Sequence, residues 1–336
     1  MNATAPATHS ATDPPATGVA RYRAGTGRPP WQLSGIAVLV AALFALPGGY
    51  VVWRALTGGA LHLLVERRAL DPLWRTVQLA VLVSASAAVL GTGLAWLTVR
   101  TDLPLRRLWR VLAPLPLVYP SFVGAAAFRS GLTPGGIVHD LAGHLGIDLQ
   151  LRLHGLVGAW LVLTLFTYPY VYLPVAARLA GLPSSLEENA RLLGDRPLRV
   201  FRRVVLPQAS SSIAAGALLV FLYTVSDFGA VHLMRFETLT QTIFRTRLFD
   251  RERSFALALL LLALALLVVA AERTIARSGA RHGDVRNGDA AIGDRRALTV
   301  PLGRWTAPAT ALAAGTVGLA LVAPAVSLAD WGLFGW

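Results

Sequence analysis

Long apolar stretches recur along the 336-residue chain, and each is long enough to cross a bilayer as a helix. The hydrocarbon core of a membrane requires about 20 consecutive, mostly apolar residues per helix. Only 15% of the residues are charged and the mean hydropathy is +0.55, whereas about a quarter of a soluble domain is charged. The sequence therefore predicts an all-α, polytopic membrane protein, with spans at about 33–55, 75–99, 109–130, 155–178, 209–233, 254–273 and 306–328.

The composition also excludes several classes of site. The chain has no cysteine, so disulfides and thiolate metal sites are excluded. All of its basic residues are arginine, and the net charge is +13. In a polytopic membrane protein such an excess is expected in cytoplasmic loops. Because no basic soluble domain is present to carry it, we do not expect nucleic-acid binding.

Changes in composition divide the chain into segments. Residues 1–30 are rich in Ala, Thr, Pro and Gly, which predicts a disordered cytoplasmic N-terminus without a secretory signal. Residues 31–274 hold the first six spans. Residues 275–304 are rich in Gly, Asp and Arg, which is typical of a flexible cytoplasmic linker. Residues 305–336 hold one further span, which we interpret as the start of a second membrane unit.

The distribution of arginine predicts the orientation. With the N-terminus inside, the arginine-rich segments 100–110, 186–207 and 273–304 also face the cytoplasm, as the positive-inside rule requires. A smaller group of arginines then lies on the outer side of the membrane, where it either lines a polar vestibule or belongs to a solvated loop. Its members are Arg235, Arg245, Arg247, Arg251 and Arg253.

The third span contains three prolines, in the sequence LAPLPLVYPSFVGAAAF at 112–128. Proline removes a helical hydrogen bond and kinks the backbone. Inside membranes, broken helices survive where they are buried in protein or line a water-filled cavity. Pro114, Pro116 and Pro120 therefore mark either a harmless kink or part of a translocation path.

An acidic residue lies near the end of the fifth span. Asp227 follows a long apolar run, and Gly229 comes two residues later. A carboxylate at membrane depth is costly, so it usually faces a cavity or a partner. We expect these two residues to bend the helix and to present a carboxylate to a permeating ion, unless Asp227 marks the true helix end at the interface.

Catalytic motifs are not found in the sequence. The chain has no G-x-S-x-G elbow, no H-E-x-x-H and no Walker A pattern, so it does not hydrolyse ATP by a P-loop mechanism. His139, Asp140 and His144 lack the spacing of a helical metal site and are interpreted as a solvated outer loop. An integral membrane enzyme using Asp227 or His232 is disfavoured, because no second intramembrane catalytic group accompanies them.

A charged segment, LEENARLLGDRPLRVFRRVVLP at 186–207, interrupts the apolar pattern. Ser184 and Glu187 form a capping-box pattern, which predicts the start of a short helix. That helix is expected to run to about Leu193, where Gly194 closes it by adopting the left-handed conformation.

A second short helix is predicted directly afterwards. Asp195 can cap it, and Pro197 falls in the first turn, where proline is tolerated. Leu206 and Pro207 are expected to end it and to redirect the chain into the fifth span. Residues 184–207 therefore predict a helix–turn–helix elbow on the cytoplasmic surface; an amphipathic loop at the lipid headgroups is the alternative.

At these residues the chain resembles the permease subunits of type I ABC importers. Their loop signature is Glu-Ala-Ala, three residues, Gly, nine residues, an aliphatic residue, one residue, and Leu-Pro. The spacing matches throughout, and the one departure is an asparagine in place of the first alanine. The matching positions are Glu188, Asn189, Ala190, Gly194, Val204, Leu206 and Pro207.

The resemblance implies a MetI-like six-helix core and a mechanical, non-enzymatic role. The elbow would dock into a dimeric ATPase partner, which uses the ATP, so that this chain itself needs no cofactor and no metal. Glu188 would contact the ATPase, Gly194 would permit the turn, and Leu206 and Pro207 would anchor the elbow. Cargo would arrive on an extracytoplasmic binding protein and cross the cytoplasmic membrane along a path that includes Pro116, Pro120, Asp227 and Gly229.

The resemblance extends over roughly residues 33–275. Within the family, these residues look most like those of the ferric-iron permeases. The similar stretches are PLVYPSFVGAAAF, LEENARLLG and VSDFGAVHLM…TLTQTIFRTRL. Ferric iron is therefore the expected cargo, with thiamine, polyamine, sulfate and phosphonate as alternatives. Such permeases usually join two six-helix halves, so this chain is expected either to pair with a second half or to be a truncated, nonfunctional half-permease.

Overall fold

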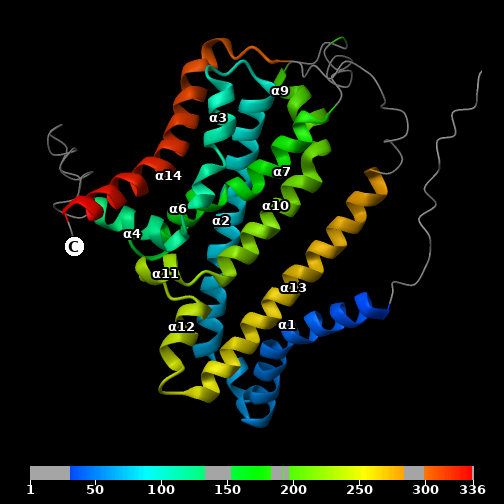
Figure 1. Cartoon of the computed structure of the whole chain (residues 1–336), viewed down its shortest axis with the longest axis vertical. Coiled ribbons are helices and arrows are strands. Elements are labelled where there is room, and N and C mark those ends of the chain that lie inside the picture. The colour runs from blue at the N-terminus through cyan, green and yellow to red at the C-terminus, as the bar shows by residue number, and fades with distance from the viewer. Residues whose placement is uncertain (1–30, 133–152, 183–191, 193–196, 284–298, 335–336) are drawn as a thin grey trace, which may run out of the picture. The chain divides into compact units, whose positions relative to one another are not determined.

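The computed structural model describes residues 31–132, 153–182, 192, 197–283 and 299–334. The chain forms two compact units that divide after Pro47, and the second unit contains the helical bundle. The helices, labelled in Figure 1, are α1 (Trp31–Thr57), η1 (Ala60–Val65), α2 (Arg67–Arg100), α3 (Arg106–Leu112), η2 (Leu115–Val118), α4 (Ser121–Leu132), α6 (Gly155–Thr167), α7 (Pro169–Ala180), α9 (Pro197–Val200), η3 (Phe201–Val205), α10 (Leu206–Ser226), α11 (Gly229–Leu233), α12 (Leu239–Thr246), α13 (Arg251–Gly283), η4 (Gly303–Trp305) and α14 (Thr306–Phe334).

The described residues confirm the all-α fold class. They contain no named strand, and the only bridge among them joins Thr101 to Val300. Six helices are long and apolar enough to cross a membrane, and a bent pair, Arg106–Val118 with Ser121–Gly131, makes a seventh. These segments coincide with the apolar stretches of the sequence, because each satisfies its backbone hydrogen bonds internally, as a bilayer requires.

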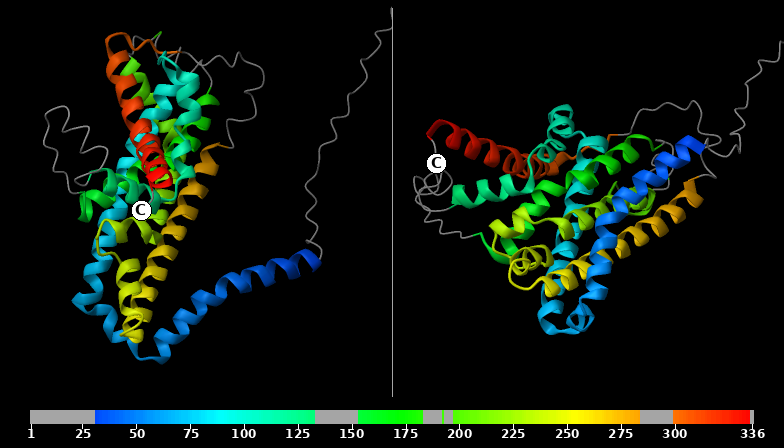
Figure 2. Two further views of the ribbon diagram at one scale, coloured as in Figure 1. Left: turned by 60° about the vertical axis from the view of Figure 1, so that its left-hand side comes forward. Right: turned by 60° about the horizontal axis from the view of Figure 1, so that its bottom comes forward.

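Helix α7 lies at the centre of the bundle, between α2 and α10 (Figures 1 and 2). Val171, Val175 and Leu179 are fully buried on it. They recur every four residues and so occupy one face of the helix. Tyr168, one residue before α7, is also fully buried, and its hydroxyl donates a hydrogen bond of 2.8 Å to the carbonyl of Ala113.

Two glycines allow the neighbouring helices to approach α7 closely. A Cβ at Gly91 of α2 would lie 2.8 Å from the carbonyl oxygen of Tyr168 and 2.9 Å from the Cβ of Val171. A Cβ at Gly216 of α10 would lie 2.7 Å from the Cα of Val171. All three distances are shorter than van der Waals contact, so any side chain would push the helices apart. Close packing at small residues is a principal source of helix association in membranes, where no hydrophobic effect operates between helices.

Two parts of the linker predicted at 275–304 lie within the described residues. Helix α13 continues to Gly283, because the Ala- and Arg-rich sequence after the apolar run keeps a high helix propensity. Val300 pairs with the end of α2, donating to the carbonyl of Arg100 (2.9 Å) and accepting from the N–H of Asp102 (3.3 Å). The Asp102 carboxylate also accepts from the N–H of Leu302 (2.8 Å). Residues 1–30, predicted to be disordered, lie outside the described residues.

Helix α14 packs into the same core as the earlier helices. Ala313, Val317 and Ala320 are buried in the main hydrophobic cluster, and Figure 2 shows α14 beside α4. The assignment of residues 305–336 to a second unit stays a prediction.

The fifth span ends earlier than predicted. Helix α10 stops at Ser226, and Asp227 adopts an extended backbone with φ −65° and ψ 131°. The predicted boundary at 233 was wrong because the Asp227 side chain begins a separate short helix, α11, instead of continuing α10.

The glycine at the α2–α7 contact provides a test of the packing. Gly91→Ala is expected to destabilise the protein by about 1–3 kcal/mol, because the added methyl group overpacks the helix crossing. Gly93→Ala is the matched control on the same helix, since nothing lies within 4 Å of a Cβ at Gly93. Thermal unfolding in detergent micelles should show a lower midpoint for the first variant alone. Equal midpoints for the two variants would contradict the packing.

Candidate functional site

The third span is broken by 96° between Arg106–Val118 and Ser121–Gly131. The short 3₁₀ segment η2 replaces α-helix before the break, as expected for a run with Pro114 and Pro116. After the break, the carbonyl of Pro120 accepts the N–H of Val123 (3.0 Å), which starts α4. The break predicted from the prolines is therefore confirmed.

Asp227 connects the broken span to the end of α10. Its side chain lies in a buried position, 8% exposed. Its Oδ1 accepts hydrogen bonds from the backbone N–H groups of Ala230 (3.0 Å) and Val231 (3.4 Å), so it caps α11. Its Oδ2 accepts a hydrogen bond from the hydroxyl of Ser121, the first residue of α4. One carboxylate thus holds the start of two helices that are distant in the sequence.

Two further contacts close this junction. The Thr240 hydroxyl of α12 donates to the backbone carbonyl of Asp227 (2.8 Å). A Cβ at Gly229 would lie 2.6 Å from the Cβ of Phe122, so α11 and α4 are in contact through this glycine. We call Ser121, Phe122, Asp227, Gly229 and Thr240 the Asp227 junction.

The residues expected along a translocation path are only partly brought together. Asp227 and Gly229 meet the first turn of α4, directly after Pro120, while Pro116 lies on the other side of the bend in η2. The sequence did not single out Ser121, whose contact with Asp227 crosses 106 positions. In this arrangement the carboxylate is occupied by three protein donors, and its geometry is that of a residue that stabilises the bend.

The elbow is only partly within the described residues. Glu188, Asn189, Ala190 and Gly194 lie outside them, and Val204, Leu206 and Pro207 lie inside. The prediction that Leu206-Pro207 ends a helix was wrong.

The chain instead continues from Pro197 to Ser226 through the π-helical turn η3. In that turn the N–H of Leu206 bonds to the carbonyl of Phe201, five residues back. The wider turn accommodates the proline, which lacks the N–H of a regular helix.

The segments on either side of the elbow are fixed to the bundle. Arg100, at the end of α2, is fully buried, and its guanidinium donates to the carbonyls of Leu179 (2.7 Å) and Leu182 (3.0 Å). These carbonyls belong to the last turn of α7 and the residues after it, so a cation meets the negative end of the helix dipole. On the other side, Arg178 donates to the carbonyl of Gln208 in α10 (3.1 Å).

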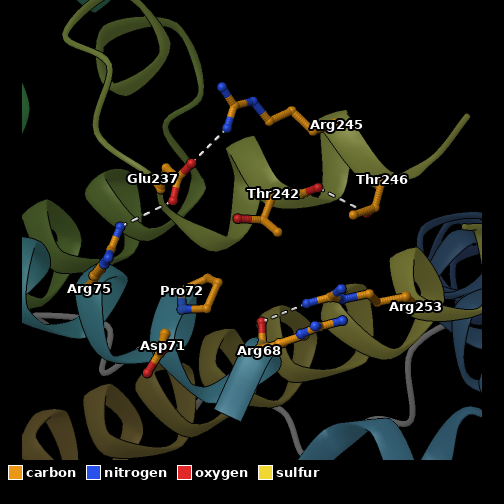
Figure 3. A pocket seen from close by; sticks show the side chains of 9 residues that line it. All are labelled: Arg68, Asp71, Pro72, Arg75, Glu237, Thr242, Arg245, Thr246 and Arg253. Atoms are coloured by element: carbon orange, nitrogen blue, oxygen red, sulfur yellow. Dashed lines mark hydrogen bonds and ion pairs between the residues drawn. The ribbon is translucent and has the colours of Figure 1, made fainter. Parts of the chain in front are cut away.

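Two basic cavities lie at the other end of the bundle, near α12. The first, which we call the α2 cavity, has a volume of about 290 Å³ and is shown in Figure 3. The second, the α11 cavity, has a volume of about 370 Å³. The α2 cavity is lined by Arg68, Asp71, Arg75, Glu237, Arg245 and Arg253. The α11 cavity is lined by Arg129, His232, Arg235, Glu237, Gln241 and Arg245.

Glu237 and Arg245 line both cavities. The Glu237 carboxylate accepts from Arg245 (2.7 Å) and from Arg75 (3.2 Å), as the dashed lines in Figure 3 show. Arg235, Arg245 and Arg253, three of the five arginines grouped in the sequence, line these cavities, and their position on the outer side stays a prediction. Arg68 and Arg129 were missed, because they come from other helices and no local pattern connects them.

The metal and enzyme interpretations receive no support from the described residues. Within the described ranges, no group of three or more His, Asp or Glu side chains is arranged to hold a metal ion. His139, Asp140 and His144 lie outside these ranges.

Residues 87–278 match the family model described as the binding-protein-dependent transport system inner membrane component. The chain belongs to this family. The matched region covers the broken span, the elbow, the Asp227 junction and most of α13. Because this family is a membrane component of transport systems, the expectation of a non-enzymatic protein agrees with it.

The names of the curated relatives refer to several different cargoes. The chain is 32% identical over 250 residues to the Fe(3+)-transport system permease protein FbpB 2 of Haemophilus influenzae, a match that covers 73% of this chain and 46% of that protein. It is 30% identical over 215 residues to a putative 2-aminoethylphosphonate transport system permease protein of Salmonella choleraesuis, covering 60% and 74%. A sulfate transport system permease protein of Escherichia coli is 28% identical over 208 residues, covering 61% and 70%.

The match spans about half the length of the Haemophilus protein (46%) and of another relative, an inner membrane ABC transporter permease protein of Escherichia coli (55%). Among solved structures, this chain resembles a chain of a bacterial ABC transporter involved in the import of alginate. The TM-score is 0.52 at 13% identity, and the match covers 76% of this chain and 96% of that one. This likeness supports the fold.

Removal of the Asp227 carboxylate tests the junction. Asp227→Ala is expected to destabilise the protein by more than about 2 kcal/mol, because two buried backbone N–H groups and a buried hydroxyl lose their acceptor. Asp227→Asn should cost less, since an amide oxygen can still cap α11. Thermal unfolding of the purified chain measures both effects.

Asp250→Ala is the matched control. Asp250 caps the N–H of Arg253 at 3.0 Å with the same geometry, but it is exposed, so water can replace the lost acceptor. Its loss should cost about 1 kcal/mol. Equal losses for Asp227→Ala and Asp250→Ala would contradict a structural role for the buried carboxylate.

Proposed function

We propose that this chain is the permease subunit of an ATP-binding-cassette importer in the cytoplasmic membrane. The observation that carries the proposal is the family match over residues 87–278, which includes the elbow with its Glu188, Gly194 and Leu206-Pro207 spacing. The bundle of membrane-spanning helices around α7 supports it. In this role the chain works with a dimeric ATPase, an extracytoplasmic binding protein and a second permease half.

The contacts at the elbow suggest how ATPase motion reaches the membrane. In the sequence, the elbow joins the end of α7 to the continuous helix that runs from Pro197 into α10. Arg100 holds the end of α7, and Gly91 and Gly216 hold α2 and α10 against it. Displacement of the elbow would therefore move these helices as one packed element.

Motion of α10 would then reach the broken span. The carboxylate of Asp227, immediately after α10, is hydrogen-bonded to Ser121 at the start of α4. The 96° break next to this contact is a place where the backbone can reorient without breaking a regular helix. We propose that the Asp227 junction converts movement of α10 into opening or closing of the path.

The proposed function requires one orientation of the chain in the membrane. The arginine-rich end with the elbow faces the cytoplasm, together with the N-terminus. The end with the two basic cavities then faces the binding protein.

For the cargo we propose ferric iron first. The support is the resemblance of the segment around Ser226-Asp227-Phe228-Gly229 to ferric-iron permeases and the 32% identity to an Fe(3+)-transport permease. A phosphonate is the second candidate. It is favoured by the basic cavities and by the 30% identity to a putative 2-aminoethylphosphonate permease, of which the chain covers 74%.

The elbow predicts a specific loss of coupling. Glu188→Arg combined with Gly194→Trp is expected to reduce the amount of ATPase subunit that co-purifies with the chain at least tenfold. The reversed charge at 188 and the bulky side chain at 194 would both disrupt the docking surface. Glu272→Arg, the same charge reversal at an exposed residue of α13 outside the elbow, is the matched control and should retain the ATPase. Undiminished co-purification of the double variant would overturn the coupling role.

The cargo is tested by uptake in cells that lack the chain. Radiolabelled ferric iron and radiolabelled 2-aminoethylphosphonate are supplied separately, and re-expression of the chain should restore uptake of one of them at least tenfold. Iron uptake that is the same with and without the chain rules out iron, and the corresponding result for the phosphonate rules out the second candidate. The Glu188→Arg, Gly194→Trp chain is the inactive control.

A further inference from the structure

The α11 cavity carries more positive charge than its own carboxylate can balance. Three arginines and one glutamate line it, which leaves a formal charge of +2 (three minus one). Glu237 is already shared between Arg75 and Arg245. In the described part of the chain, no carboxylate forms an ion pair with Arg129 or Arg235. Their guanidinium groups are therefore available to an anion.

Gln241 contributes a second and independent observation. This residue of α12 is 4% exposed, and among the described residues its Oε1 has no hydrogen-bond donor. A buried acceptor without a partner is costly and calls for an explanation such as a ligand. Gln241 is also one of the residues that line the cavity, beside the arginines.

The backbone at Arg235 also indicates a site. Arg235 has a φ of 54°, in the left-handed region, where it closes α11. The N–H of Phe236 bonds to the carbonyl of Val231 (2.9 Å), as in a helix end that normally carries glycine. An arginine at this position is strained, and such strain is typical of functional positions.

We propose that the α11 cavity binds a phosphate or phosphonate group that carries one proton. The guanidinium groups of Arg129, Arg235 and Arg245 suit the negatively charged oxygens, since arginine matches phosphate geometry with several donors. The remaining P–O–H would donate to Oε1 of Gln241. Phosphate monoesters keep this proton up to a pKa of about 6, whereas sulfate has no proton to donate.

This inference rests on the proposed function and deepens its second cargo candidate, the phosphonate, because the proposed orientation turns the cavity toward the binding protein. Its test needs no ATPase partner, so the two can fail separately. Phosphate binding without any ATPase association would leave the site standing and overturn the permease role. ATPase association without phosphate binding would leave the permease role standing and overturn the phosphate site.

The test is equilibrium dialysis of radiolabelled inorganic phosphate against the full chain in maltoside micelles, at about pH 6, where inorganic phosphate still carries a proton. Saturable binding is expected, with sulfate competing at least tenfold more weakly. Gln241→Leu should reduce this discrimination. Arg304→Gln, at an exposed arginine next to α14 and remote from the cavity, is the control that should bind as the unchanged chain does.

Arg235→Gly separates a loss of binding from a loss of folding. Glycine suits the left-handed backbone, so this variant should unfold at a higher temperature. It should nevertheless bind phosphate at least tenfold more weakly. Wild-type affinity in Arg235→Gly, the absence of saturable binding, or equal competition by sulfate would each overturn the proposal.

A lipid could present the same chemical group, as phosphatidic acid. The dialysis is therefore repeated in lipid discs with and without phosphatidic acid. A tenfold weaker apparent affinity for phosphate in its presence would assign the site to the lipid headgroup, and an unchanged affinity would assign it to a free ligand.

Discussion

The close approach of α2 and α10 to α7 is the contact on which the bundle depends. It is possible because Gly91 and Gly216 have no side chains where they meet Tyr168 and Val171. Within a bilayer, the hydrophobic effect gives no preference for helix–helix over helix–lipid contact, so such steric fit must hold the helices together. The same fit packs α2, α7 and α10 together, as the proposed coupling between the elbow and the broken span requires.

Much of the fold follows from the sequence because its determinants are local. Apolar length predicts the membrane spans, and Pro114, Pro116 and Pro120 predict the broken one. The errors come from two places where local rules were overridden. Pro207 does not end a helix, because the π turn before it removes the need for its N–H. Asp227 does not lie inside a helix, because its carboxylate caps α11.

The site is less predictable, because its contacts are distant in sequence. Asp227 was recognisable as an intramembrane acid, but its partner Ser121 lies 106 positions away. The outer arginines were visible as a group, whereas their meeting with Arg68, Arg129 and Gln241 depends on how α2, α4 and α12 pack. The bundle thus places a charged, cavity-bearing end opposite the elbow, with the Asp227 junction connecting α10 to the broken span.

The central claim is that movement of the elbow reaches the broken span through α10. Because the chain has no cysteine, spin labels can be placed at Val118→Cys, beside the break, and Ser226→Cys, at the end of α10. Their separation is measured by pulsed electron resonance in the complex with the ATPase, with and without ATP. The account predicts a change with ATP that disappears in the Glu188→Arg, Gly194→Trp background. An unchanged separation in a complex that hydrolyses ATP and transports cargo would contradict it.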